Sequence, residues 1–381
     1  MAALYFDHAA TTPLLPEVRD TIVDSMDVYG NPSSLHRLGL EAERRLEASR
    51  QQVGRALGVT SGRIVFTGSG TEANNLAILG AAQRFRGRGQ HLVTTAVEHA
   101  SVLETMRALE RAGWRVTYVR PEANGMVSAQ AVLDAVTTDT VLVSMMHVNN
   151  ETGALLPVDA VASALRPRKR IVFHVDGIQA FGKIPQAAAA ASADLYTVSG
   201  HKVGAPKGIG GLFVRAGLEL DPLVHGGGQE FGLRSGTQNL LGIFAFGTAA
   251  HVRHGRSTHD LSRLQMLRDG FVAALAAMPG CRVTQPASAS PYIVNASFVG
   301  LRGEVLLHAL EAAGLFASTG SACSSHGGRA KPSHVLTAMG QSEEEMTGAI
   351  RFSLSPDHTQ GDVDAALEII RAQVAWLRNL L

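Results

Sequence analysis

A series of short apolar, β-rich segments interrupted by helical stretches occupies the chain between about residues 63 and 215. Most segments are unbroken runs of Val, Ile, Leu and Phe, a pattern typical of strands buried on both faces. They are RIVFT (63–67), HLVTTA (91–96), WRVTYV (114–119), TVLVSMM (140–146), RIVFHVD (170–176), DLYTVS (194–199) and IGGLFVR (209–215). Helical patterns such as EANNLAILGAAQRF lie between the first of them. The sequence therefore predicts an α/β fold with a mostly parallel sheet of about seven strands sandwiched by helices.

The pattern changes beyond about residue 237, where long helices take over. They are followed by two apparent strands, YIVNASFV (292–299) and AIRFSLS (349–355). A chain of 381 residues is long enough to divide into two domains. We therefore expect a large α/β domain over residues 14–260 and a second, smaller α+β domain built from residues 1–13 and 261–381.

The composition and charge of the chain bear on which partners and cofactors the protein can be expected to bind. The chain is 45% hydrophobic and 18% charged with a formal net charge of +1, which gives no electrostatic reason to expect a nucleic-acid or membrane partner. Asp7 and His8 interrupt the short apolar start, which lacks a basic leader, and no apolar run approaches the roughly 20 residues of a membrane helix. Two cysteines, Cys281 and Cys323, form no disulfide framework and no metal motif. We expect a cytoplasmic protein without a metal site.

The stretch TGSGTEANN follows the strand RIVFT and opens a helix. Backbone N–H groups at a glycine-rich helix start bind anions, so we expect a phosphate near Gly70 and Thr71. Gly68, Gly70 and Ala73 also fit the dinucleotide fingerprint G-x-G-x-x-A, with Glu98 at the end of the next strand as the acid for a ribose. A plain tight turn is a third interpretation. This stretch alone does not choose among them.

Polar side chains follow three other strands at their carboxyl ends, where parallel sheets bind ligands. His99 follows the second strand, Asp176 ends the fifth and Lys202 comes directly after the sixth. Singly, each has a structural interpretation: a packed histidine, a helix cap and a solvated loop lysine. Together with a phosphate cradle they match pyridoxal phosphate, which needs a lysine that bonds to its aldehyde and a carboxylate for its ring nitrogen. A dinucleotide has no use for the lysine.

The order of motifs resembles the cysteine desulfurases of the NifS/IscS type, which belong to the class V aminotransferases of pyridoxal-phosphate fold type I. The motifs are FDHAATTP, GNPSSLH, TGSGTEANN, VEHASV, MHVNNETG, HVDGIQAFGK, SGHKVGAPKGIG, HGGGQE, RSGT, STGSACSS and IRFSLS. The resemblance implies a homodimer that removes sulfur from L-cysteine and releases L-alanine. It also implies that a persulfide on Cys323 is passed to an acceptor protein, for iron–sulfur cluster assembly or thiolation.

The resemblance also implies how the cofactor is held. Lys202 binds pyridoxal phosphate and then acts as the base at the substrate Cα, while His99 stacks on the ring. Asp176 pairs with the ring nitrogen and Gln179 with the ring hydroxyl. The remaining cofactor-binding residues that it implies are Gly70, Thr71, Asn150, Ser199, His201 and, from the partner subunit, Thr237.

For the substrate, the resemblance implies that Arg351 grips the carboxylate, for which a planar guanidinium is well suited, and that Asn31 assists. Cys323 is the implied nucleophile toward the substrate sulfur. A free cysteine more often behaves as a small buried apolar residue, and this simpler description is the one we expect for Cys281. For Cys323, the serine- and glycine-rich surroundings leave room for either a small buried residue or a reactive thiol, and the resemblance implies the reactive thiol.

Three alternatives stay open from the sequence. A selenocysteine lyase or a cysteine-sulfinate-active enzyme would share the same scaffold. A dehydrogenase would use the G-x-G-x-x-A stretch to bind a nicotinamide dinucleotide. A non-catalytic sulfur-carrier adaptor would keep only Cys323, although the presence of Lys202, Asp176 and His99 speaks against it.

Overall fold

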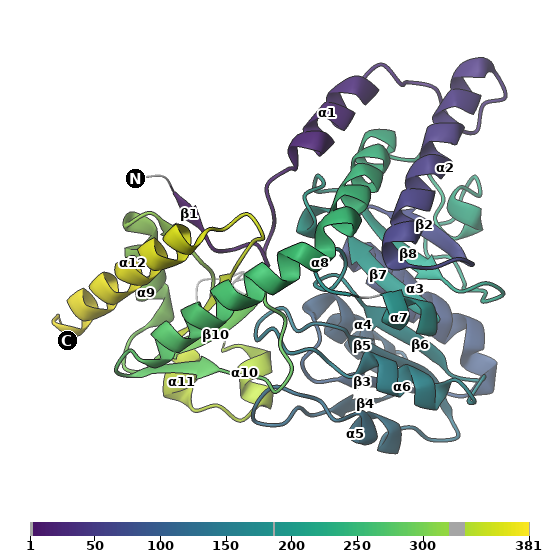
Figure 1. Ribbon diagram of the computed structural model, residues 1–381. Helices are drawn as coiled ribbons and strands as arrows, with labels where there is room; N and C mark the ends of the chain where they lie inside the picture. The colour runs from purple at the N-terminus through teal and green to yellow at the C-terminus, as the bar shows by residue number, and fades with distance from the viewer. Residues whose placement is uncertain (1–2, 186, 320–331, 381) are drawn as a thin grey trace.

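The structure, a computed structural model, describes residues 3–185, 187–319 and 332–380. Within these ranges a seven-stranded sheet forms the centre of the larger part of the molecule (Figure 1). Its order is β2 (Arg63–Thr67), β8 (Gly210–Val214), β7 (Leu195–Ser199), β6 (Val172–Asp176), β5 (Thr140–Met146), β3 (His91–Thr95) and β4 (Arg115–Val119). Only β8 runs antiparallel to its neighbours in this sheet. The predicted α/β class and mostly parallel sheet are confirmed.

Helices cover both faces of this sheet, because successive strand residues point to opposite sides. Ile64 belongs to the apolar cluster that contains Val53, whereas its neighbour Val65 belongs to the cluster that contains Leu76. The covering helices are α2 (Arg37–Leu57), α3 (Gly70–Phe85), α4 (Ala100–Arg111), α5 (Ala129–Asp134), α6 (Val158–Leu165) and α7 (Ala187–Ser192), while α1 (Pro16–Ser25) packs against α8 (Leu240–Ala276). Burial on both faces explains why the strands read as unbroken apolar runs.

A second group of strands and helices gathers the two ends of the chain (Figure 1). β1 (Leu4–Tyr5) pairs in parallel with β11 (Leu315–Phe316), and an antiparallel sheet has the order β12 (Ala349–Ser353), β10 (Ile293–Phe298), β9 (Cys281–Thr284). The accompanying helices are α9 (Gly303–Ala312), α10 (His334–Ala338), α11 (Glu343–Thr347) and α12 (Gln360–Arg378). None of the helices in the described ranges is both long and apolar enough to cross a membrane.

The long helix α8 (Leu240–Ala276) connects the two groups. Its first turns contribute Ile243 to the apolar core beside the large sheet, and its last turns contribute Phe271 to the core around β10 and β12. The helix runs without a break through residue 260. The division into domains at that residue stays a prediction.

Strand β8, the second strand from one edge of the sheet, supports the start of α3. A Cβ atom added to Gly210 would lie 2.6 Å from the backbone carbon of Ser69 and 2.8 Å from the backbone nitrogen of Gly70. A side chain at position 210 would therefore clash with the backbone of Ser69 and Gly70, which cannot relieve the clash by changing a rotamer. The absence of a side chain at Gly210 lets the first turn of α3 approach the sheet.

We predict that Gly210→Ala lowers the free energy of unfolding by about 1–3 kcal/mol, because the added methyl group displaces the Ser69–Gly70 turn. Urea unfolding followed by circular dichroism measures this. Gly211→Ala is the matched control in the same strand, since its added Cβ would meet only side-chain atoms at 3.3 Å or more. An equal or larger loss in the control would contradict the prediction.

Candidate active site

The site lies where the carboxyl ends of β6 and β7 meet the beginning of α3. Asp176 is the last residue of β6 and Ser199 the last of β7, and both are buried. A Cβ added to Gly70 would lie 3.3 Å from the Cβ of Ser199, so the first turn of α3 sits directly against this strand end. The first backbone N–H groups of a helix, here those of Gly70 and Thr71, have no partner within the helix and favour an anion.

A chain of hydrogen bonds links two of the predicted residues. The Asn74 side chain donates to Asp176 Oδ2 at 2.8 Å and to Ser101 Oγ at 2.9 Å. Ser101 Oγ lies in turn 2.9 Å from His99 Nδ1. Asp176 and His99 are thus joined through two residues that the sequence analysis did not select. Asn74 lies one helical turn after Gly70 in the TGSGTEANN stretch, which was the available signal.

The position of His99 fixes its tautomer. The residue caps α4, and its Nδ1 accepts a hydrogen bond of 3.1 Å from the backbone N–H of Ser101, so the ring proton is on Nε2. Burial lowers the pKa of His99, the positive charges of Lys202 and His334 add to this effect, and Asp176 opposes it. The imidazole is therefore neutral at physiological pH.

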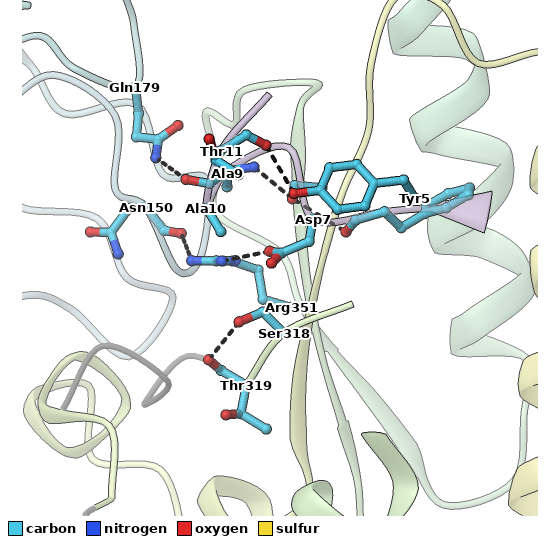
Figure 2. Close-up of polar contacts among 12 residues, drawn as sticks. Tyr5, Asp7, Ala9, Ala10, Thr11, Asn150, Gln179, Ser318, Thr319 and Arg351 are labelled. Atoms are coloured by element: carbon cyan, nitrogen blue, oxygen red, sulfur yellow. Dashed lines mark hydrogen bonds and ion pairs between the residues drawn. The ribbon is translucent and has the colours of Figure 1, made fainter. Parts of the chain in front are cut away.

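The N-terminal segment lies across the same edge of the sheet. Lys202 Nζ donates to the carbonyl oxygens of Ala9 at 2.6 Å and Ala10 at 2.7 Å. Gln179 Nε2 donates to the Ala9 carbonyl as well, at 2.8 Å (Figure 2). The backbone N–H of Thr12 donates to the carbonyl of His201 at 2.9 Å. Gln179, His201 and Lys202, which follow β6 and β7, are thus hydrogen-bonded to the segment FDHAATTP. The sequence analysis used that segment only as a family motif.

Arg351 of β12 is buried at the junction of the two groups of strands. Its Nη2 lies 2.8 Å from Asp7 Oδ1, and its Nη1 donates to the backbone carbonyl of Asn150 at 3.1 Å (Figure 2). Its side chain is only 5% exposed, which rules out a solvated surface ion pair. Asp7 was not selected as a site residue from the sequence, which gave it only as a break in an apolar start and as part of the motif FDHAATTP.

Two predicted residues lie away from this site, and a third lies outside the described residues. Asn31 is exposed, and its Oδ1 accepts from the backbone of Ser33 at 2.9 Å. Thr237 is exposed in the segment before α8. No hydrogen bond in the described ranges joins either to the residues above. Cys323 lies outside the described residues, whereas Cys281 is buried in β9 and burial raises its thiol pKa to about 11.

Glu98 decides against the dinucleotide interpretation. The residue is fully buried, and its Oε1 accepts from the Thr95 hydroxyl at 2.6 Å and from the backbone N–H of Met146 at 2.9 Å. A carboxylate that binds a ribose needs to face a ligand, and this one is enclosed by its own sheet. Among the described residues, no group of three or more His, Cys, Asp or Glu side chains could hold a metal ion.

The model of the aminotransferase class-V family matches residues 4–366. The chain belongs to the class-V aminotransferases. This chain is 38% identical over 380 residues to cysteine desulfurase IscS of Methanosarcina thermophila, covering 99% of this chain and 93% of the relative. It is 40% identical over 387 residues to cysteine desulfurase IscS of Shewanella sp. (strain MR-4), covering 99% and 94%.

Solved structures agree with this placement among the class-V aminotransferases. A NifS-like protein superposes with a TM-score of 0.91 at 36% identity and covers 98% of this chain and 100% of its own. A structure titled SspA in complex with cysteine superposes with a TM-score of 0.81 at 35% identity, covering 93% and 99%. The family expected from the motifs is confirmed over essentially the whole chain.

Glu98 also gives a test of the site's electrostatics. Burial raises its pKa to about 8, the negative charge of Asp176 adds to this, and the Thr95 and Met146 hydrogen bonds oppose it. The ordinary glutamate pKa is near 4.5. Between these two values the folded protein holds a proton that the unfolded chain has lost, so stability falls as pH rises.

We predict that Glu98→Gln, which cannot lose this proton, makes the free energy of unfolding less dependent on pH between pH 5 and pH 8. Across that range the change in the free energy of unfolding should differ from that of the wild type by about 3–4 kcal/mol. Urea unfolding at several pH values measures it, with the exposed Glu43→Gln as the control. Parallel curves for wild type and Glu98→Gln would show that Glu98 is ionised throughout.

Proposed function

We propose that this chain is a pyridoxal-phosphate-dependent L-cysteine desulfurase that forms a persulfide on Cys323 and releases L-alanine. The observation that carries the proposal is the meeting of Lys202, Asp176 and His99 beside the anion-binding start of α3. The full-length relatives named cysteine desulfurase support the same reaction.

The environment of Asp176 fits a cofactor with a protonated ring nitrogen. The carboxylate is 4% exposed and accepts from two neutral donors, Asn74 Nδ2 at 2.8 Å and the backbone N–H of Ile178 at 3.0 Å. In the part of the chain that the structure describes it forms no ion pair. A buried carboxylate is destabilising without a cationic partner, and the ring nitrogen would be that partner. The other groups of the cofactor also have partners. Lys202 would bind its aldehyde, Gln179 its ring hydroxyl, and the start of α3 its phosphate.

Bound pyridoxal phosphate would supply an electron-accepting ring conjugated to the substrate amino group. The chain's own residues orient and deprotonate the substrate. Arg351 offers a guanidinium fork to the carboxylate, beside Asp7. The Lys202 amine takes the proton from the substrate Cα, and neutral His99, with its proton on Nε2, can pass a proton to or from the substrate.

Cys323 carries out the sulfur transfer. Its thiolate attacks the substrate sulfur, an S–S bond forms, and the C–S bond breaks with its electron pair left on carbon. Protonation of that carbon gives alanine. The described residues on either side of Cys323 are anchored at the site, since Ser318 pairs with the backbone of Arg351 and His334 Nε2 lies 2.8 Å from the Glu98 carbonyl.

We predict that Cys323→Ser binds pyridoxal phosphate and changes its absorbance when L-cysteine is added, yet loses alanine release by at least about a hundredfold, because a hydroxyl is a poor nucleophile toward sulfur. Cys281→Ser is the matched control and should keep most of the activity. Alanine formation and mass spectrometry of the persulfide measure these outcomes. Wild-type turnover by Cys323→Ser would end the proposed mechanism.

We also propose that the enzyme is a homodimer. Large apolar side chains are exposed on α1 and on the segment that follows it. They are Val23, Met26, Tyr29 and Leu35, with exposed fractions from 63% to 91%. A second copy of the chain would cover such a surface. Thr237, exposed and separate from the phosphate cradle, would then reach the partner's site, as the resemblance implies.

Mixing two inactive variants tests the shared site. We predict that Thr237→Ala and Lys202→Ala subunits, each impaired alone, recover activity when mixed, because half of the sites in a mixed dimer carry neither substitution. Activity after subunit exchange, with exchange verified by native mass spectrometry, measures this. Exchange without recovery would place Thr237 outside the partner's site.

For the biological role, we propose that the persulfide passes to an acceptor protein in iron–sulfur cluster assembly or thiolation, in the cytoplasm. The relatives named IscS support the first of these destinations.

A further inference from the structure

Lys183 is a second lysine at the site, and the mechanism above does not use it. Its side chain is buried, with 5% of the residue exposed, and in the described ranges no carboxylate forms an ion pair with it. Lysine is rarely buried without a partner, because removing an ammonium group from water is costly. A lysine kept in such a place needs a role in the folded protein.

The backbone after β6 brings Lys183 to Gln179. Residues 177–184 form successive helical turns, in which the N–H of Phe181 donates to Gly177 and the N–H of Ile184 to Ala180. Side chains four residues apart then lie on the same side. Lys183 Nζ accordingly donates to Gln179 Oε1 at 2.8 Å.

The two ends of the Gln179 amide are therefore distinguishable. The Ala9 carbonyl can only accept, so the amide nitrogen that lies 2.8 Å from it must be the donor, as Figure 2 shows. Oε1 then faces Lys183. One Nε2 hydrogen goes to Ala9, and the second has no acceptor among the described residues. That second hydrogen is available to an oxygen of a ligand.

We propose that Lys183 is a positioning residue that fixes the Gln179 amide so that its nitrogen, not its oxygen, faces the ring hydroxyl of the cofactor. The inference rests on the proposed function and deepens it. A flipped amide would turn Oε1 toward the electron-rich ring oxygen, and two acceptors would then face each other. Without Lys183, the Ala9 contact is the one hydrogen bond of the Gln179 amide within the described residues that would oppose that flip.

The charges around Lys183 suit this role. Burial lowers its pKa well below the usual value, and the positive charges of Lys202, Arg253 and Arg351 lower it further. A neutral amine still donates a hydrogen bond, so Lys183 can hold Gln179 without adding another cation beside Lys202. Arginine could not do the same, because its guanidinium stays charged.

A double-mutant cycle on cofactor binding tests the proposal. The dissociation constant of pyridoxal phosphate is measured by absorbance titration of folded apoprotein, which needs no turnover. We predict that Lys183→Met weakens binding about tenfold, the effect of losing one buried hydrogen bond. In a Gln179→Leu background the same change should alter the constant by less than about twofold, because the two residues act as one unit. Lys183→Gln, which keeps a donor on a shorter stem, should recover part of the loss.

The controls separate this inference from the proposed function. Lys169→Met changes an exposed lysine and should leave binding as in the wild type. Equal losses from Lys183→Met in both backgrounds, or no loss in either, would overturn the positioning role while leaving the desulfurase proposal in place. Wild-type apoprotein that does not bind pyridoxal phosphate would overturn both.

Discussion

The buried carboxylate of Asp176 is the interaction on which the site is built. It receives Asn74 from α3, and Asn74 extends the connection through Ser101 to His99 at the start of α4. Its own backbone carbonyl accepts from the N–H of His147. Asp176 therefore connects the starts of α3 and α4 with the ends of the neighbouring strands β5 and β6. Such a network is stable only when each member has a partner, so the geometry of the site and the packing of the sheet are determined together.

Basic side chains gather at the same edge, where Lys202 and Arg351 lie close enough to Lys183 to lower its pKa in addition to burial. Asp7 balances the charge of Arg351, and the carbonyl groups of the N-terminal segment accept hydrogen bonds from Lys202. The segment comes from the start of the chain but lies against the ends of β6 and β7. An excess of positive charge here suits a site that would receive a phosphate and a substrate carboxylate. Burial lowers the pKa values of Lys183 and His99, and neighbouring positive charges lower them further.

The junction between the two groups of strands brings Arg351 close to the described residues that flank Cys323. Arg351 lies in β12, contacts Asn150 after β5, and pairs through its backbone with Ser318. On the other flank of the Cys323 segment, the Ser333 hydroxyl donates to Glu151 at 2.5 Å. Both flanks of that segment are thus attached to residues beside the expected position of the substrate carboxylate.

The sequence by itself determined the strands of the large sheet and the residues at their ends. Burial on both faces leaves an unbroken apolar run that can be read locally, and a lysine or aspartate directly after such a run is conspicuous. The predicted strands consequently agree with the observed ones to within two residues. Lys202, Asp176 and His99 were found in the same way.

Only the tertiary structure decided how these residues are connected. Asn74 meets Asp176 across 102 positions of the chain, and Asp7 meets Arg351 across 344. No local pattern marks such pairs, because each partner alone resembles an ordinary helix or loop residue. Gln179 is the clearest case: its contact with Lys183 is local, four residues along the chain, whereas its contact with the Ala9 carbonyl spans 170 positions. Hydrogen bonds between distant segments form only when the chain folds. These bonds bring the separate residues together into one site.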